Sequence, residues 1–276
     1  MTNSPHRFHR HPAAPWAELR DSAPSPHCFR LHMHAEYSIG IVDAGRTLFH
    51  HAHGPQPVAA GGVVLIEPGA WHACNPEPGA PWSYRMLFVD ADWLHARLGV
   101  AALRFAQRAL ADADIARQVD GLCRPVDGPA AALRLAQGLE QLMARCAEPA
   151  TAPLHDHGAE LQAALRRLHA APDAGLTVQS LAQECGMSAT RFIRRFKAAT
   201  GMTPGSYRLN LRLNGARRLL ATGAALSEAA YAMGFADQAH LQRAFKAHHA
   251  LTPGCYARGG QPRAATPPAA QEIRPT

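Results

Sequence analysis

Two stretches of the chain carry basic and aromatic side chains in nearly the same order. Residues 189–208 read ATRFIRRFKAATGMTPGSYR, and residues 239–258 read AHLQRAFKAHHALTPGCYAR. Arg194 and Arg243 occupy matching places, and each copy also holds a matching lysine, a Thr-Pro-Gly run and a tyrosine. Guanidinium groups bind phosphate and the edge of guanine, and ammonium groups bind phosphate. The repetition therefore indicates two anion-binding modules of one kind.

The charge balance changes along the chain. Residues 158–260 carry 13 Lys and Arg against 5 Asp and Glu, whereas residues 1–157 carry 13 against 15. The excess positive charge, +7 at pH 7, thus lies in the region of the repeat. This is the pattern of a protein that binds a polyanion, although an anionic membrane surface would attract the same region.

The first copy predicts a helix, a tight turn and a second helix. Thr177 is a natural cap for a helix that runs through Glu184, and Ser188 caps a helix that runs to about Thr200. Gly186 lies between them and tolerates the positive φ of a tight turn. Apolar residues at helical spacing form a shared core, which leaves one polar face of the second helix toward solvent. That face carries Thr190, Arg191, Arg194, Arg195 and Lys197.

The second copy repeats the core positions and changes the exposed ones, which suits the reading of two different short sequences. Between the copies, Pro204 opens and Gly223 closes a predicted helix of about 27 Å, from roughly eighteen residues at 1.5 Å each. A rod of that length holds two recognition helices near the roughly 34 Å of one DNA turn. Duplication for packing alone is the competing interpretation.

The first half of the chain has a different character. Between Phe29 and Val89, short runs rich in β-formers alternate with glycine and proline, which predicts an antiparallel β-barrel or sandwich. Residues 129–146 then show apolar positions at spacings of three and four, which predicts a helix with one apolar stripe. The stripe packs either on the barrel or on a second subunit. An apolar stripe alone does not determine which of these surfaces covers it.

Residues 158–258 resemble the DNA-binding domain of the AraC/XylS family of transcriptional regulators. The lines LA..CGMS...F.R.FK..TG.TP..Y and A...GF.....L.R.FK....LTP..Y carry the resemblance. It implies that the base-reading positions are Thr190, Ile193 and Arg194 in the first motif and Gln238, His240, Gln242 and Arg243 in the second. Arg195, Lys197 and Lys246 are better placed for phosphates, which set position rather than sequence choice. RNA polymerase is the further partner that the family implies.

The first half resembles the cupin-type sensor of the same family, through HMHAEYSIGIVDAG and GGVVLIEPGAWHACNPEPG. In cupins, His-x-His with a later Glu and His can hold a metal, which makes His32, His34 and His72 candidate ligands here. Glu36 follows His34 by only two residues instead of four or five. Three interpretations stay open: a metal site for zinc, iron or copper, a small-molecule pocket, and structural histidines. The candidate effector-binding residues are His32, His34, Glu36, Trp71, His72 and Tyr84, and no cofactor is expected.

The sequence thus predicts an α+β protein: a flexible segment (1–26), a cupin-like antiparallel β-barrel with helices (27–146), a linker (147–157), an all-α domain of two helix-turn-helix motifs joined by a long helix (158–258) and a disordered tail (259–276). Six scattered cysteines and the lack of a long apolar run favour a cytoplasmic protein that does not bind membranes. We expect a transcriptional regulator, more consistent with an activator, that binds promoter DNA in the major groove, responds to a small-molecule effector and can dimerise through 129–146. Two alternatives are a metal-dependent cupin enzyme with an appended DNA-binding module and an architectural nucleic-acid binder; the degenerate metal spacing argues against the enzyme.

Overall fold

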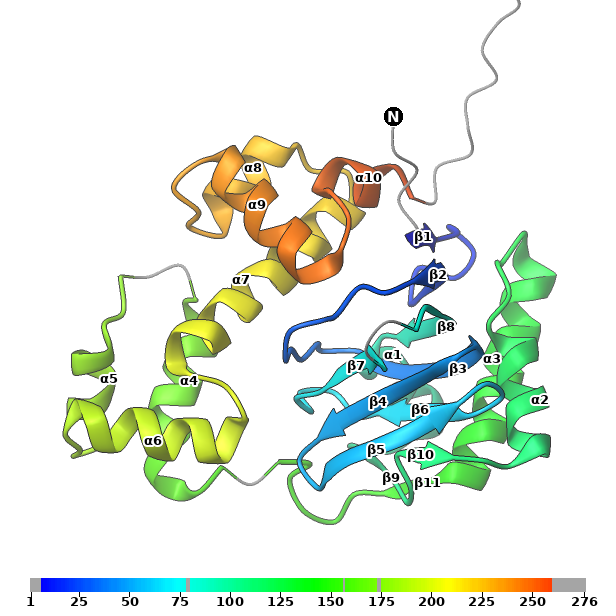
Figure 1. Ribbon diagram of the computed structural model, residues 1–276, viewed down its shortest axis with the longest axis horizontal. Helices are drawn as coiled ribbons and strands as arrows, with labels where there is room; N and C mark the ends of the chain where they lie inside the picture. Colours follow the sequence, from blue (N-terminus) through cyan, green and yellow to red (C-terminus); the bar gives the residue numbers. More distant parts are fainter. Residues whose placement is uncertain (1–5, 78–79, 156, 173–174, 260–276) are drawn as a thin grey trace, which may run out of the picture.

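Strands dominate the first half of the chain and helices the second (Figure 1). The structure is a computed structural model that describes residues 6–77, 80–155, 157–172 and 175–259. The predicted order of an antiparallel β domain followed by a helical domain is confirmed.

Antiparallel pairing joins the strands of the N-terminal domain. The larger sheet has the order β1 (His6–His9), β2 (Ala17–Ser25), β8 (Trp82–Val89), β3 (Tyr37–Ala44), β6 (Val63–Ile66) and β10 (Ala109–Leu110). The smaller sheet has the order β5 (Gly54–Ala59), β4 (Arg46–His51) and β7 (Ala73–Pro76). A separate pair is formed by β11 (Ala147–Pro149) and β9 (Leu103–Phe105).

The two faces of the larger sheet belong to different cores, as the alternation of side chains along a strand requires. Tyr84 and Phe88 of β8 pack in a core that includes Phe49 of the smaller sheet. Leu87 and Val89 of the same strand pack in a second core with the N-terminal domain's helices. These helices are α1 (Ala91–Leu98), α2 (Ala113–Leu122) and α3 (Pro129–Cys146).

The apolar stripe of α3 is used within the subunit. Ala132, Leu135, Leu139, Leu142 and Cys146 are all buried, and the last four belong to the core on the helix side of the larger sheet. The stripe is therefore not a free dimerisation surface, because the sheet already covers it. On the outer side of α3, Leu133 remains 54% exposed.

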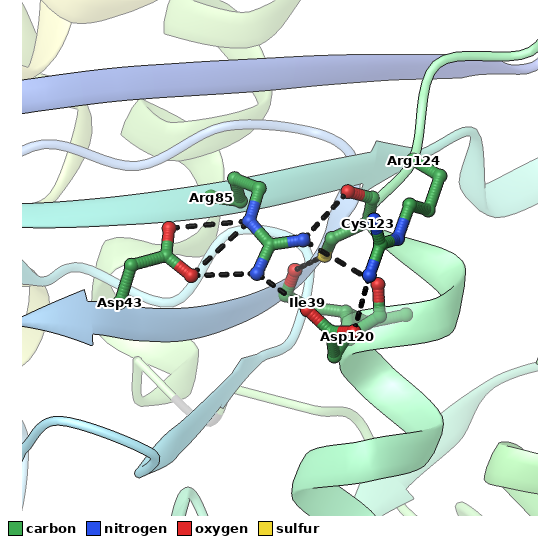
Figure 2. Close-up of polar contacts among 6 residues, drawn as sticks. All are labelled: Ile39, Asp43, Arg85, Asp120, Cys123 and Arg124. Carbon is green, nitrogen blue, oxygen red and sulfur yellow. Dashed lines mark hydrogen bonds and ion pairs between the residues drawn. The ribbon is translucent and has the colours of Figure 1, made fainter.

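A cluster of charges ties α2 to the larger sheet (Figure 2). Arg85 of β8 donates to Asp43 at the end of β3 and to Asp120 of α2, with Nη2 to oxygen distances of 2.6 Å each. Its Nη1 also donates to the carbonyl oxygen of Cys123 at 3.1 Å. Arg124 shares Asp120 from the other side. The cluster has a structural role, since it orients α2 on the sheet.

The N-terminal segment 1–26 differs from the flexible segment that the sequence predicts. Over residues 6–25 it supplies β1 and β2, and β2 pairs with β8 from Ala17 to Ser25. The sequence of β2 hides this, because it contains a buried arginine, Arg20, and little apolar alternation. Residues 147–149 of the predicted linker likewise form β11, through backbone pairing with β9.

In the C-terminal domain, all regular elements within residues 157–172 and 175–259 are helices. They are η1 (Ala159–Leu161), α4 (Gln162–Ala170), α5 (Val178–Glu184), α6 (Ala189–Thr200), α7 (Pro204–Ala221), α8 (Leu226–Ala232), α9 (Gln238–His249) and α10 (Pro253–Arg258). Helix α7 runs between the group α4 to α6 and the group α8 to α10 (Figure 1). This arrangement is the predicted pair of motifs joined by a long helix.

Local sequence signals set the helix ends. Thr177 caps α5 with its side chain, Ser188 caps α6 and Thr203 caps α7. The two turn glycines, Gly186 and Gly234, have φ values of +62° and +67°, a conformation that side chains with a Cβ adopt at a cost. The first helix-turn-helix prediction is therefore confirmed in its bounds and turn, and the second copy folds as the same helix, turn and helix.

Among the described residues, no helix combines the length and apolar character needed to cross a membrane. All six cysteines are free thiols. The predicted disordered tail lies, apart from Gly259, outside the described residues.

Candidate nucleic-acid interface and sensor cavities

Helix α6 presents one polar face to solvent. Phe192 and Phe196 on its other side are fully buried in the core of α4 to α7. The predicted residues all lie on the exposed side: Thr190, Arg191, Ile193, Arg194, Arg195 and Lys197. Arg195 is partly engaged, because its Nε donates to Glu160 of η1 at 2.6 Å. Thr190, Arg191, Ile193 and Arg194 thus form the freest part of the face.

Helix α9 repeats this arrangement with other side chains. Leu241 and Phe245 are fully buried beneath it. Gln238, Gln242, Arg243 and Lys246 are exposed. His240 is half-buried, with its ring 5.2 Å from that of Phe235. The structure therefore places the predicted residues of the second motif on one face, with His240 at its edge.

The chemistry of the two faces suits base edges. Among the described residues, Arg191, Arg194 and Arg243 form no ion pair, so their guanidinium groups are available to a ligand. Arginine pairs with guanine through two hydrogen bonds and glutamine with adenine in the major groove. The far ends of both helices contact the N-terminal domain: Gly201 after α6 lies against Trp71, and the carbonyl of His249 in α9 accepts from Arg20 at 3.4 Å. The N-terminal parts of both helices are left for a partner.

Three histidines converge inside the N-terminal domain. His32 and His72 pair through two backbone hydrogen bonds of 3.0 and 2.8 Å, and their rings lie 4.3 Å apart. The ring of His34 lies 4.8 Å from that of His72. Candidate ligand atoms of the three residues all fall within 4.8 Å of one another. Burial lowers the pKa of His34 to about 3, and burial also lowers the pKa of His32 and His72 well below the usual value. All three rings are therefore neutral at pH 7.

Backbone carbonyl oxygens determine which ring nitrogen carries the proton. Nδ1 of each histidine lies near a carbonyl: that of Arg30 at 2.8 Å for His32, that of Glu36 at 3.1 Å for His34 and that of Ala70 at 2.9 Å for His72. A carbonyl oxygen only accepts, so Nδ1 must be the protonated nitrogen of each neutral ring. The Nε2 lone pairs of His32 and His72 remain for a ligand, whereas Nε2 of His34 lies 3.2 Å from the Ser38 hydroxyl, which can donate to it.

A small cavity of about 40 Å³ adjoins these rings and is also lined by Arg20, Cys74 and Tyr84. Arg20 is only 7% exposed and has no carboxylate partner among the described residues; it lies over the Phe29 ring at 4.8 Å. Drug-sized ligands need roughly 300 to 1,000 Å³. The space suits a metal ion, a water molecule or a small anion instead.

The structure separates the other predicted effector residues from this cluster. Trp71 lines another cavity of about 300 Å³, together with Arg104, Arg108 and His155, and His72 borders this cavity as well. Glu36 turns toward the C-terminal domain and pairs with Arg217 of α7 at 2.5 Å. His32, His34, His72 and Tyr84 line the small cavity together, and His72 lies between it and the cavity of Trp71. The six residues predicted to bind the effector therefore lie at three different places in the fold.

Polar contacts between the two domains involve Asn210, Asn214 and Glu18, which the sequence patterns did not single out. Asn210 of α7 accepts from the backbone N–H of Met33 at 3.1 Å and donates to its carbonyl at 2.8 Å. Asn214 donates to the same carbonyl at 2.8 Å. Near the chain's end, the Tyr256 hydroxyl donates to Glu18 of β2 at 2.6 Å. Asn210 lies three residues from both Tyr207 and Leu213, on the buried stripe of α7, but helical spacing does not say which segment covers that stripe.

A larger cavity, of about 630 Å³, lies between the domains beside these contacts. The N-terminal domain contributes Arg10, Trp16, Glu18, Glu36 and Phe88, and the C-terminal domain contributes Arg217, Arg218, Leu220 and Tyr256. Burial raises the pKa of Glu36, but the Arg217 guanidinium outweighs it and holds that pKa at about 2. The cavity thus combines aromatic walls with an ion pair that joins the domains.

Comparison with known proteins gives matches for both halves of the chain. The AraC-like ligand binding domain matches residues 19–143, and a helix-turn-helix domain matches residues 181–259. The uncharacterized HTH-type transcriptional regulator YbfI of Bacillus subtilis (strain 168) is 25% identical over 223 residues, 77% of this chain and 81% of that protein. The HTH-type transcriptional regulator MtrA of Neisseria gonorrhoeae is 32% identical over 92 residues, 33% of this chain and 31% of that protein.

Solved structures show the same fold over nearly the whole chain. An apo variant of ToxT from Vibrio cholerae strain SCE256 has a TM-score of 0.55 at 11% identity and covers 94% of this chain and 99% of that one. Wild-type ToxT bound to an unsaturated fatty acid has a TM-score of 0.54 at 11% identity, with 95% and 98% covered. With a ligand-binding domain before a helix-turn-helix domain, the chain belongs to the AraC family of DNA-binding transcriptional regulators.

Proposed function

We propose that this regulator grips two adjacent major-groove segments with α6 and α9, and that an acidic effector between its domains changes how the DNA-binding domain is held. The observation that carries the proposal is the interdomain cavity of about 630 Å³, which contains the Glu36–Arg217 pair. A ligand there touches both domains at once. It can shift their arrangement because it binds one arrangement better than another.

The DNA part of the proposal rests on the exposed faces of α6 and α9. Helix α7 has 18 residues, hence a length of about 27 Å at 1.5 Å per residue, close to the roughly 34 Å between successive major grooves on one side of DNA. We assign base contacts to Thr190, Arg191, Ile193, Arg194, Gln238, His240, Gln242 and Arg243. Lys197, Lys246 and, after release from Glu160, Arg195 contact phosphates.

The effector part rests on the composition of the interdomain cavity. Its volume falls in the range of small-molecule sites, and it offers aromatic surface from Trp16 and Phe88 beside the Arg217 guanidinium. Solved ToxT structures contain an unsaturated fatty acid or a naphthalenyl butenoic acid, both apolar molecules with a carboxyl group. We propose an effector of the same chemical class here. Its carboxylate competes with Glu36 for Arg217 and so weakens the contact between the domains.

Activation by contact with RNA polymerase is part of the proposal, on the strength of the family. A homodimer through residues 129–146 would use the outer side of α3, where Leu133 is exposed, because the stripe on the inner side is buried. Sedimentation of a Leu133→Glu variant tests this: a dimer that persists in the variant rules out that surface.

The proposal is tested by footprinting the full chain on genomic fragments selected by binding. We expect protection of two major-groove segments about one turn apart. Protection of one isolated segment would contradict the proposal that α6 and α9 bind two adjacent major-groove segments. A panel of medium- and long-chain carboxylic acids and their methyl esters then tests the effector: acids should change the footprint and esters should not. Equal effects of acids and esters would exclude competition for Arg217.

A further inference from the structure

We propose that Arg212 of α7 is a positioning residue for the second recognition helix, and that it acts through Phe235 and His240 on the choice of base pairs by α9. This inference rests on the proposed function, in which α9 contacts base edges. It adds that the sequence preference of α9 depends on a side chain that holds the preceding turn and not the DNA.

Arg212 binds the turn at residues 233–237, between two helices that lie beside the C-terminal half of α7 (Figure 1). Its Nε donates to the carbonyl oxygen of Met233 at 2.6 Å, and its Nη2 donates to that of Gly234. Both carbonyls lie at the C-terminal end of α8, where helix carbonyls lack partners within the helix and carry the negative end of its dipole. A guanidinium presents its N–H groups in a rigid fork, so the two bonds fix the direction of the turn as well as its position.

The same guanidinium lies against an aromatic ring that leads to α9. Cζ of Arg212 lies 4.2 Å from the centre of the Phe235 ring, which is a cation–π distance. The Phe235 ring is buried, and its centre lies 5.2 Å from that of the His240 ring, with an angle of 81° between the rings. His240 is in the first turn of α9, where its backbone N–H donates to the cap Asp237 at 2.6 Å. Arg212 and Phe235 therefore join α7 to one of the side chains that we assign to base contacts.

Helix α7 also approaches the turn closely at Gly215. A Cβ at this position would lie 2.1 Å from Sδ of Met233, so any larger residue would push the Met233 side chain aside. Arg212 and Gly215 are three residues apart and thus share one face of α7. This face is fitted to the turn before α9 by one polar and one steric contact.

The other side of α7 is fixed on the sensor domain. Asn210 and Asn214 lie two residues before and two after Arg212, which is about 200° around the helix. Both asparagines donate to the carbonyl oxygen of Met33 at 2.8 Å. Arg212 therefore holds the turn from a helix that is itself held in place.

Base contacts need this precision more than phosphate contacts do. A side chain that recognises a ligand must be held within about 0.5 Å of its productive geometry, and supporting residues provide that. Phosphate contacts set position and carry no sequence information. Arg212→Lys keeps the positive charge, but an ammonium group has neither the planar fork nor the flat surface that lies on Phe235. We therefore expect this variant to lose base discrimination more than general affinity for DNA.

The first motif offers a matched control on the same helix. Arg208 lies one turn before Arg212, and its Nη1 donates to the carbonyl oxygen of Leu176 at 2.7 Å, just before α5. It is thus an α7 arginine that binds a backbone carbonyl of the other motif. Arg208→Lys should leave base selection by α9 unchanged.

The test uses the full chain and a DNA site selected by its binding. Affinity is measured at fixed salt for that site, for each single base-pair substitution in it and for a random duplex. Arg243→Ala identifies the half of the site that α9 contacts. In that half, Arg212→Lys and Phe235→Leu should lower the preference for the selected base pairs roughly 5- to 30-fold, the lower part of what a base contact supplies. Their affinity for random duplex should stay within about twofold of the unaltered chain, because the phosphate contacts remain.

A double variant tests whether Arg212 acts through His240. His240→Ala removes the base contact at the end of the series, so Arg212→Lys should add little further loss at the base pair that His240 selects. Losses that simply add at that base pair would contradict an action through His240.

The controls separate failure of this inference from failure of the proposed function. If Arg243→Ala affects neither half of the site, α9 does not contact base edges, and both proposals fail. If Arg243→Ala identifies a half in which Arg212→Lys keeps every base preference, or weakens the selected site and random duplex equally, this inference alone fails. Thermal unfolding monitored by circular dichroism verifies that each variant is folded. If Arg212→Lys does not fold, the same criteria applied to Phe235→Leu decide the outcome.

Discussion

Replacement of Glu36 by glutamine tests whether the ion pair with Arg217 holds the two domains together. The carboxylate lies 2.5 Å from Nη2 of Arg217, and the side chains are 20% and 7% exposed. Glutamine keeps the size of the side chain but leaves the buried guanidinium without its ion-pair partner. Removal of one partner from a buried pair costs about 3–5 kcal/mol, and the partial exposure of Glu36 lowers the expected cost below that range, to about 2–3 kcal/mol. In a docking equilibrium this corresponds to roughly 30- to 150-fold.

The assay is urea unfolding of the full chain for Glu36→Gln, Arg217→Met and the double variant. Arg217→Met removes the buried charge itself, so the double variant should be more stable than the sum of the single changes implies. We expect an interaction energy of about 1–3 kcal/mol. Glu77→Gln is the control, because its pair with Arg46 is long, 3.4 Å, and more than half exposed on both sides. Such a pair contributes about 0–1 kcal/mol.

Two results would refute this reasoning. If Glu36→Gln costs no more than Glu77→Gln, the pair does not hold the domains. If the single changes add without interaction, the two side chains act independently. Either outcome also removes the basis for an effector that acts by competing for Arg217.

Three further outcomes follow from the structure. Arg243→Ala should weaken binding to one half of the DNA site by about 1–3 kcal/mol and leave random duplex nearly unaffected at fixed salt, as fluorescence anisotropy can show; equal losses on both would make it a phosphate contact. Burial lowers the pKa of His6 from 6.5 to about 3, so the folded state stays unprotonated while the unfolded state binds a proton below pH 6.5. The free energy of unfolding therefore decreases as pH falls from 6.5 toward 3. In urea unfolding between pH 7.5 and 5.5, this decrease should be about 1.4 kcal/mol smaller for His6→Gln than for the unaltered chain. An equal decrease in both proteins would contradict this explanation. Gly201→Ala should destabilise the fold by about 2–4 kcal/mol, because φ of Gly201 is +71° and a Cβ there would lie 2.5 Å from Trp71. Gly186→Ala, at φ +62° with open space around it, should destabilise the fold by about 1–2 kcal/mol. Equal losses of stability in thermal unfolding would mean that Trp71 moves freely.

The helix-turn-helix pair could be predicted because its signals are local. The caps Thr177 and Ser188 and the turn glycine Gly186 act within a few residues, and apolar spacing alone identifies the buried side of each helix. The exposed side then follows by exclusion, so the exposure of Arg194 and Arg243 was predictable as well. The family resemblance added the expected role of each position.

The tertiary structure alone decided what the polar residues of the first domain contact. Glu36 read as an effector ligand but pairs with Arg217, which lies 181 residues further along the chain. Asn210 holds Met33 across 177 residues; its spacing from Tyr207 and Leu213 places it on the buried side of α7, but that pattern does not reveal its partner. The stripe of α3 could pack on a sheet or a second subunit, and the sheet takes it. Caps, turns and periodicity depend on neighbours in sequence, whereas the partner of a buried polar or apolar side chain depends on segments that meet only after the chain has folded.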